Sequence, residues 1–152
     1  MTLEAAETLA LELIKEHGLE WTFTFDRAKR RFGCCNYTTQ TISLSRSLTL
    51  LNDKAEVRDT LLHEIAHALT PGTGHGAAWR KKCLEIGAKP ERCYSGVQVA
   101  QPEPNFFLEC PSCQQRVPRM RRSRRALYCR SCCKEHAAGR AAEAFKMRWR
   151  RA

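Results

Sequence analysis

Two histidines one helical turn apart form the first group of residues whose types and spacing could perform chemistry. His63 and His67 enclose Glu64 in the pattern His-Glu-X-X-His, or HExxH. Residues four apart lie on the same face of a helix, so both imidazoles can reach one metal ion. The Glu64 carboxylate would lie beside that ion, where it can take a proton from water that zinc acidifies. The pattern predicts a catalytic zinc site with Glu64 as its general base.

A catalytic zinc site needs a third protein ligand and one open coordination position. His75 follows His67 by eight residues, beyond a Pro71-Gly72 break at which the chain can turn back. Glu85, in the next predicted helix, is the alternative ligand. The residues favour His75 over Glu85 as the third ligand. Tyr37 is a candidate donor to the negatively charged oxygen that develops in a hydrolytic reaction.

Two Cys-X-X-Cys pairs form the second group. Fifteen residues separate them, and two such pairs can complete a closed tetrahedral zinc site. The predicted ligands of this structural zinc are Cys110, Cys113, Cys129 and Cys132. Cys133 is one cysteine more than the site needs, and His136 is a less favoured substitute ligand. The chain is therefore expected to bind two Zn²⁺ ions, one catalytic and one structural. The other cysteines, Cys34, Cys35, Cys83 and Cys93, are expected to be ordinary buried thiols.

Charge is concentrated at one end of the chain, whose formal net charge is +10. Residues 1–105 contain 13 Lys+Arg and 13 Asp+Glu, whereas residues 106–152 contain 13 Lys+Arg and three Asp+Glu. Such an excess predicts an extended polyanion as partner, nucleic acid above all. Arginine binds phosphate and stacks on bases, and aromatic rings add stacking surface. The predicted nucleic-acid-binding residues are Arg116, Arg119, Arg121, Arg122, Arg124, Arg125 and Tyr128, and Phe106, Phe107, Arg148, Arg150 and Arg151 would extend that surface.

The elements that must position these residues can be predicted from local patterns. Apolar spacing predicts a helix over 3–17, followed by Gly18, and alternation predicts short strands at 21–26, 32–37 and 42–44. These strands resemble a small antiparallel meander packed on the first helix. Asp53 and Glu56 have the spacing of a capping box, which predicts a helix from there to about Leu69. A further helix is expected from near Gly76 to Gly87, and the Ala/Arg-rich segment after Lys134 is helix-prone.

These elements predict an α+β fold in several parts. We expect a core over 1–100, a proline-rich linker over 101–105, a four-cysteine zinc ribbon over 106–133 and a basic helical tail over 134–152. No run of 18 apolar residues and no basic leader is present, which predicts an intracellular protein without a membrane partner. Nothing in the sequence suggests an oligomer, so a monomer is expected.

The motifs of the core resemble those of a known family. The block from His63 to Leu69, then Gly74-His75-Gly76 and Trp79, is similar to the SprT-like metalloproteases, which include Spartan and its bacterial relatives. The resemblance implies a zincin-like core of helices on a small antiparallel sheet, a third zinc ligand at His75, and proteolysis. Bacterial members carry a similar zinc ribbon, and the family implies a role in the repair of DNA–protein crosslinks.

The leading hypothesis is therefore a zinc-dependent endopeptidase that acts on DNA-associated proteins, including proteins crosslinked to DNA. Its basic ribbon would bind DNA, with single-stranded or junction-containing DNA expected. One alternative is a non-catalytic, zinc-containing module that binds nucleic acid. The other is a general peptidase whose activity does not depend on DNA.

Overall fold

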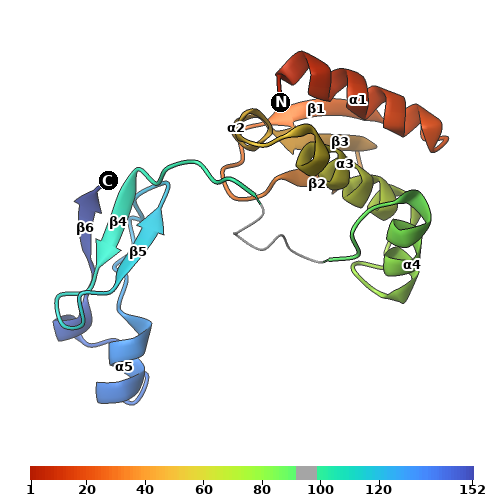
Figure 1. The fold of residues 1–152 in the computed structure, drawn as a ribbon. Coiled ribbons are helices and arrows are strands. Elements are labelled where there is room, and N and C mark those ends of the chain that lie inside the picture. Colours follow the sequence, from red (N-terminus) through yellow and green to blue (C-terminus); the bar gives the residue numbers. More distant parts are fainter. Residues whose placement is uncertain (92–98) are drawn as a thin grey trace. The chain divides into compact units, whose positions relative to one another are not determined.

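The computed structural model describes residues 1–91 and 99–152, which divide into one unit over Met1–Pro102 and another over Glu103–Ala152 (Figure 1). None of the helices in these residues combines the length and the apolar composition that crossing a bilayer requires. The first unit contains, in chain order, α1 (Leu3–Glu16), β1 (Thr22–Asp26), β2 (Gly33–Asn36), β3 (Thr41–Ser45), α2 (Arg46–Leu51), α3 (Lys54–Leu69) and α4 (Ala77–Ile86).

The α+β class is confirmed, but the predicted antiparallel meander is wrong. β3 lies in the middle of the sheet, where it pairs antiparallel with β2 and parallel with β1. β1 and β2 are therefore not neighbours. Residues 27–32 carry the chain from β1 to the opposite edge of the sheet, and the turn at 37–40 returns it as β3 between β1 and β2. Alternation specifies which face of a strand is buried, but it does not specify which strand lies beside it.

The helices cover one face of this sheet and form the core with it. Ile42 and Leu44 of β3 are fully buried, and Phe23 and Phe25 of β1 pack against the same cluster. Thr22 and Thr24, which alternate with those phenylalanines, are exposed, so the other face of β1 meets solvent. α1 packs against β1, α3 packs against β2 and β3, and the two helices contact each other. β2 is left as an edge strand beside α3.

α3 begins and ends as its sequence predicts. The Asp53 side chain accepts a hydrogen bond of 3.0 Å from the Glu56 backbone N–H, and the helix runs to Leu69. α4 follows Gly76 and ends at Gly87, whose φ of +79° allows the chain to leave in a left-handed conformation. α2 was not predicted, although Ser45 caps its first turn by accepting a hydrogen bond from the Leu48 N–H at 3.2 Å.

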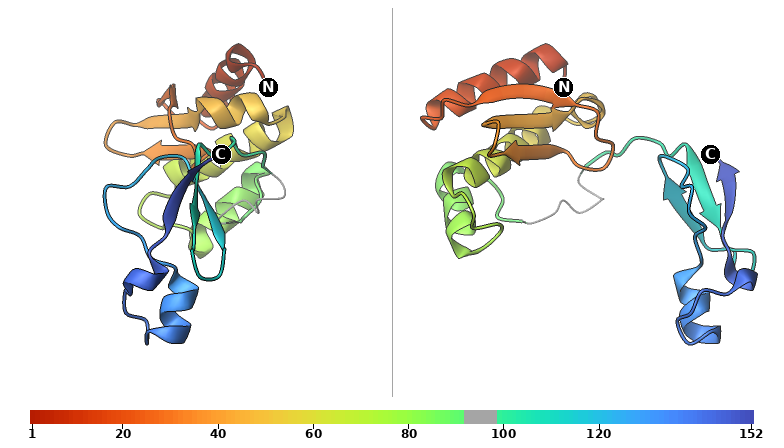
Figure 2. Two further views of the ribbon diagram at one scale, coloured as in Figure 1. Left: turned by 90° about the vertical axis from the view of Figure 1, so that its left-hand side faces the viewer. Right: turned by 180° about the vertical axis from the view of Figure 1, so that it is seen from behind.

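The second unit is a small antiparallel sheet with one short helix at its end (Figure 2). The strand order is β5-β4-β6. Its elements are β4 (Phe106–Glu109), β5 (Arg116–Arg119), α5 (Arg130–His136), the 3₁₀ turn η1 (Glu143–Phe145) and β6 (Arg148–Arg151).

The helical tail predicted over 134–152 is wrong beyond His136. α5 ends there because Ala138 and Gly139 take positive φ values, and the Gly139 N–H donates to the Cys133 carbonyl at 2.8 Å. The chain then returns as β6, which pairs with β4. Phe145 and Met147 pack against the buried ribbon cysteines, so the tail belongs to the hydrophobic cluster of this unit.

The isolated cysteines meet the expectation only in part. Cys83 is buried on α4, whereas Cys34 and Cys35 on β2 are half-buried. Cys93 lies outside the described residues. Cys133 is also buried, on α5.

Because α3 is buried in the core, substitutions on it should change the free energy of unfolding. Leu61 is fully buried in the core, so Leu61→Ala should lower the free energy of unfolding by about 2–5 kcal/mol through lost contacts and a residual cavity. Leu84 on α4 is 67% exposed, and Leu84→Ala should change it by no more than about 0.5 kcal/mol. Urea unfolding followed by circular dichroism measures both values. Equal losses for the two variants would contradict this description of the core.

Candidate metal centres and the pocket beside them

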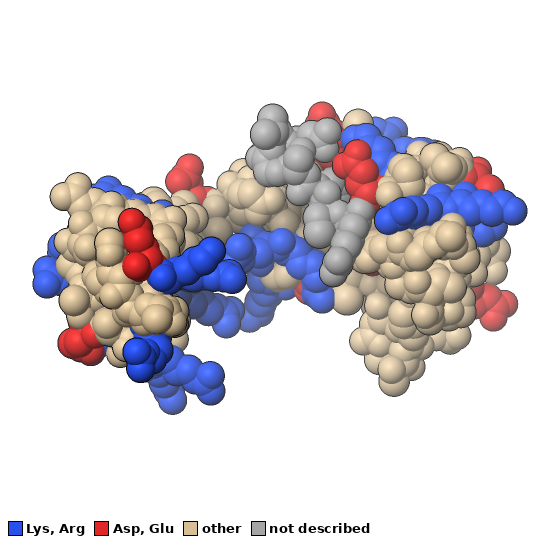
Figure 3. Space-filling view, turned by 90° about the horizontal axis from the view of Figure 1, so that it is seen from below, with Lys and Arg blue, Asp and Glu red and all other residues tan. Residues whose placement is uncertain are grey.

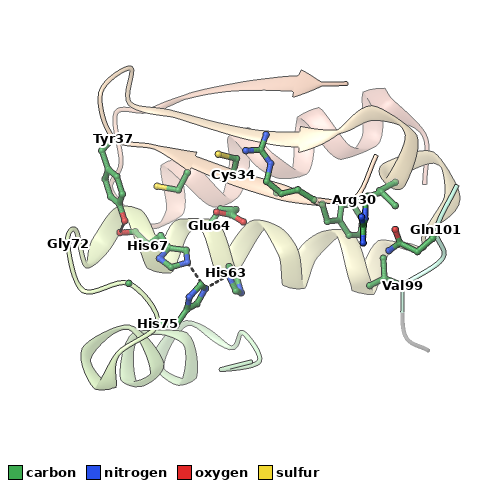
Figure 4. Close-up of a pocket in the computed structure, with 16 residues that line it drawn as sticks. Arg30, Cys34, Tyr37, His63, Glu64, His67, Gly72, His75, Val99 and Gln101 are labelled. Carbon is green, nitrogen blue, oxygen red and sulfur yellow. Dashed lines mark hydrogen bonds between the residues drawn. The ribbon is translucent and has the colours of Figure 1, made fainter. Parts of the chain in front are cut away.

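Three imidazoles meet at the C-terminal half of α3. His63 and His67 lie on that helix, and His75 comes from the loop before α4 (Figure 4). The Nε2 atom of His75 lies 3.1 Å from Nε2 of His67 and 3.3 Å from Nε2 of His63. Zinc with Zn–N distances of about 2.0–2.1 Å would set tetrahedral N–N edges of about 3.3–3.4 Å. The three nitrogens therefore fit one zinc ion.

His75, not Glu85, is the residue that joins the HExxH pair. Among the described residues the cluster contains only His63, His67 and His75, which leaves a fourth tetrahedral position without a protein ligand. Glu85 instead pairs with Lys82 on α4 at 2.5 Å and is exposed. The favoured alternative of the sequence analysis is the one that the geometry supports.

The loop from 70 to 76 turns back because two glycines adopt positive φ values. Gly72 has a φ of +77° and Gly74 a φ of +54°, both in the region that disfavours other residues. The Thr73 hydroxyl donates to the Thr70 carbonyl at 2.8 Å, and the Gly76 N–H donates to the Thr73 carbonyl at 3.1 Å. These turns place His75 beside His63 and His67 of α3.

The Trp79 ring packs against all three imidazoles. It is fully buried on α4, and its ring is nearly parallel to that of His67, with centroids 5.2 Å apart. The rings of His63 and His75 meet it edge to face at 4.8 and 4.6 Å. In the sequence Trp79 is only one residue of a motif. That its ring packs against the three imidazoles is visible only in the fold.

The imidazoles of His63 and His67 are held in the neutral form that binds metal. Burial, then the charges of His67 and His75, lowers the pKa of His63 to about 4. Burial and the charge of His75 likewise lower the pKa of His67 to about 4. At neutral pH neither ring has to lose a proton before it can bind an ion.

Glu64 is buried against β2. Its side chain is near the Cys35 backbone N–H, which donates to the carboxylate. Gly33 makes room for it, because a Cβ at that position would lie 2.7 Å from both Cγ and Oε1 of Glu64. Burial raises the pKa of Glu64 to about 7, although the charge of Arg31 and the Cys35 hydrogen bond oppose the rise. A carboxyl with that pKa can accept and release a proton near neutral pH.

A cavity of about 620 Å³ opens beside these groups. His63, Glu64, His67 and His75 line one part of it, and the edge strand β2 forms a wall (Figure 4). Tyr37 also lines it, but its hydroxyl donates to the His67 carbonyl at 3.1 Å. A direct role of Tyr37 in binding a developing oxyanion remains a prediction.

The four ribbon cysteines form the second cluster. The sulfur of Cys110 lies 3.8 Å from that of Cys132, and the sulfur of Cys113 lies 3.7 Å from that of Cys129. A tetrahedral site with Zn–S distances of about 2.3 Å has edges of about 3.8 Å. These thiols therefore fit one zinc ion.

The two residues considered as substitutes in this cluster do not belong to it. Cys133 is buried but lies outside the group of four. His136 is exposed and contacts the Glu135 carboxylate and the Phe145 ring. The described residues therefore support the ligand set that the spacing predicted.

The predicted nucleic-acid-binding residues are distributed over one strand and the loop after it, and the four loop arginines are exposed. Figure 3 shows Lys and Arg side chains projecting from this unit, which is the left-hand body in that view. Arg116 and Arg119 lie on β5, and the loop from 120 to 128 carries Arg121, Arg122, Arg124, Arg125 and Tyr128.

Two features of this basic surface were not predicted from the sequence. Glu109 accepts from Arg116 at 2.9 Å and from Arg150 at 3.4 Å, which lowers the pKa of its carboxyl. Trp149 meets Phe106 edge to face at 6.1 Å. The Arg122 guanidinium lies over both rings, 5.9 and 5.8 Å from their centroids. The alternation of Trp149 with arginines was a strand signal that could have predicted its place.

Comparisons with known proteins concern mainly the first unit. No curated protein matches the chain. The crystal structure of the metallopeptidase zymogen of Methanocaldococcus jannaschii jannalysin is similar over 53% of this chain and 79% of that chain, at 15% sequence identity and a TM-score of 0.48. A likeness of that size does not establish a shared activity. The SprT-like family model matches residues 3–101, which include the three histidines and Glu64. The chain therefore belongs to the SprT-like family.

Proposed function

We propose that the chain is a zinc-dependent endopeptidase. The observation that carries the proposal is the set of three imidazole nitrogens at tetrahedral spacing, with a buried carboxylate beside them and a cavity in front. Family membership agrees with it. His63, His67 and His75 would hold the zinc, whose chemistry when bound is to polarise a carbonyl and to acidify water.

The chain's own residues would then move the proton and orient the substrate. Glu64 accepts a proton from the attacking water and passes it to the leaving amine, a transfer for which a pKa near 7 is well suited. β2 is an edge strand that lines the cavity, so backbone groups at its outer edge, other than the Cys35 N–H that Glu64 engages, can align an extended peptide. Trp79 keeps the imidazoles in place.

A non-catalytic zinc module is disfavoured by the same geometry. A structural zinc site is closed by four protein ligands, as the cysteine cluster would be. The histidine cluster supplies three ligands and adjoins a cavity. Burying the Glu64 carboxylate costs free energy, and a structural zinc site would gain nothing from a carboxylate at that position.

We further propose that the ribbon binds DNA and brings the peptidase to DNA-associated proteins, including crosslinked ones. Phe106 and Trp149 share one face of the sheet, and Arg119 and Arg151 lie directly opposite Phe106 on the neighbouring strands. Aromatic rings flanked by arginines suit the unpaired bases and phosphates of a single strand. The general-peptidase alternative assigns this surface no role in cleavage.

Removal of the proposed base tests the activity. Glu64→Gln should lower the cleavage rate of a basic DNA-binding protein by about 10²–10⁴-fold, because the general base is lost. Its zinc content should stay at two ions per chain, measured by mass spectrometry, whereas His75→Ala should lose one. Each variant is tested with and without single-stranded DNA. Cleavage by Glu64→Gln at the wild-type rate would contradict the proposal, and DNA-independent cleavage by the wild type would favour the general peptidase.

The space at Gly33 gives a second test of the same base. Gly33→Ala should lower kcat at least about tenfold with little change in KM, because the new Cβ displaces the Glu64 carboxylate. Zinc content should remain at the wild-type value. Thr24→Ala, on the exposed face of β1 and away from the cavity, serves as the control and should keep kcat within about twofold. A Gly33→Ala variant with wild-type kcat would show that Glu64 does not act from the observed position.

The ribbon surface predicts a graded response to mutation. Trp149→Ala should weaken binding to a single-stranded oligonucleotide about tenfold and affect duplex binding less, because a stacking surface is lost. Arg124→Ala should reduce the salt dependence by about 0.7 in log–log slope if it contacts one phosphate. Arg116→Ala is the matched control with the smaller effect, since Glu109 already engages that arginine. Fluorescence anisotropy measures all three, and equal losses for Arg116→Ala and Trp149→Ala would contradict this surface.

A further inference from the structure

The cavity beside the histidines has a second end with different chemistry. Figure 4 shows the histidines at one end, and Arg30, Val99 and Gln101 at the other. The wall of β2, including Cys34, runs between the two ends. A peptide that lies along this wall with its scissile bond at the histidines would extend toward Arg30.

The two arginines that line this cavity are not equivalent. The Arg31 guanidinium lies 2.6 Å from the Asp26 carboxylate, which also accepts from the Ser43 hydroxyl and the Ala28 N–H. The guanidinium of Arg31 is therefore already engaged in an ion pair within the fold. The Arg30 guanidinium, by contrast, has no ion pair or hydrogen bond with any residue in the described ranges 1–91 and 99–152. Its positive charge and its donors are available to a ligand.

The backbone that carries Arg30 is held on both sides. The Ala28 carbonyl accepts from the Ser45 hydroxyl at 2.6 Å. Phe32 is buried, and its carbonyl accepts from the Ser45 N–H at 2.7 Å. The backbone at Arg30 is therefore fixed before a ligand binds, and only the exposed Arg30 side chain has to be ordered.

Gln101 is positioned by a buried amide. Asn52 is 6% exposed; its Oδ1 accepts from the Ala100 N–H at 2.7 Å, and its Nδ2 donates to the Ala100 carbonyl at 3.0 Å. Nδ2 also donates to the Leu48 carbonyl at 2.8 Å. Asn52 thus pins the backbone next to Gln101 to α2, and the Gln101 side chain adds an amide N–H₂ donor to the Arg30 end of the cavity.

The surroundings strengthen any charge pair that forms there. Phe32, Leu48 and Val99 line the cavity and are themselves buried side chains. A charged group seated over this apolar surface is partly removed from water, so its attraction to a guanidinium is larger than on an open surface. The site is therefore suited to a single planar anion with apolar neighbours.

We propose that Arg30 and Gln101 form a subsite that binds a carboxylate of the peptide substrate. The carboxylate comes either from an Asp or Glu side chain or from the C-terminus of the substrate, since the two share the same planar group. The subsite rests on the proposed peptidase function, and it gives the enzyme a preference for one carboxylate at one position of the peptide, separate from any attraction of the ribbon to DNA.

The test uses the full-length, zinc-loaded protein and short synthetic peptides. In one series a single Glu is moved through every position of a neutral peptide, with Gln at the same position as its partner. In the other, a free C-terminal acid is compared with the C-terminal amide. The wild type should cleave the acidic member about tenfold faster in kcat/KM at one position, or for the free acid, which identifies the source of the carboxylate.

Variants of the basic turn then assign the preference. Arg30→Ala should reduce the ratio of acidic to neutral cleavage to about one, and Arg30→Glu should shift the preference toward Lys at that position. Lys29→Ala is the matched control, because Lys29 belongs to the same turn but does not line the cavity, and it should leave the ratio unchanged. A tenfold ratio that persists in Arg30→Ala, or a ratio of one in the wild type, would overturn the subsite.

A binding measurement separates failure of the subsite from failure of the proposed function. Anisotropy of labelled Glu and Gln peptides is recorded with Glu64→Gln, and again after Arg30→Ala is added. Tighter binding of the Glu peptide that is lost with Arg30→Ala supports the subsite even if no peptide is cleaved, a result that would contradict only the peptidase. Cleavage without any effect of Arg30 on binding or rate would overturn the subsite and leave the peptidase standing.

Discussion

The first unit is organised around three polar side chains of one helix, of which His63 and Glu64 are buried and His67 is half-buried. α3 carries His63, Glu64 and His67 on a stretch whose neighbours form the hydrophobic core. Removing such groups from water costs free energy unless they gain partners. The partners come from every adjoining element: the Cys35 N–H and the space at Gly33 from β2, and the Trp79 ring from α4. The sheet, the glycine loop and α4 are thus arranged to make one polar cluster tolerable inside the core.

The hydrophobic cores of the two units differ in composition. The first unit has a cluster of apolar side chains from helices and strands, which would exist without a metal. In the second unit Phe145 and Met147 pack against a buried cluster of Cys110, Cys129 and Cys132, and Leu108 is the one fully buried aliphatic side chain among the described residues of that unit. So little apolar surface cannot by itself outweigh the entropy of ordering the chain. Zinc binding by the thiols is therefore expected to be the main source of folding free energy there.

Local patterns predicted the parts of the structure that depend on neighbours in sequence. The cap at Asp53, the stop at Gly87 and the ligand spacings are of this kind, and each agrees with the observed geometry. Pairings between distant segments escaped prediction. The place of β3 between its neighbours and the return of the tail as β6 depend on which strands meet, and alternation leaves that undetermined.

Contacts between segments distant in sequence also explain why two features of the candidate sites could be found only from the structure. A glycine in a strand is unremarkable until the Glu64 carboxylate is found where its Cβ would lie. Arg30 and Arg31 are adjacent in sequence and both line the cavity, yet only Arg31 forms an ion pair with Asp26. If the ribbon binds DNA as proposed, it raises the effective concentration of the first unit near any protein on the same strand. Recruitment would then depend on the charge of the ribbon, while the choice of peptide bond would depend on the cavity, so that each could change without the other.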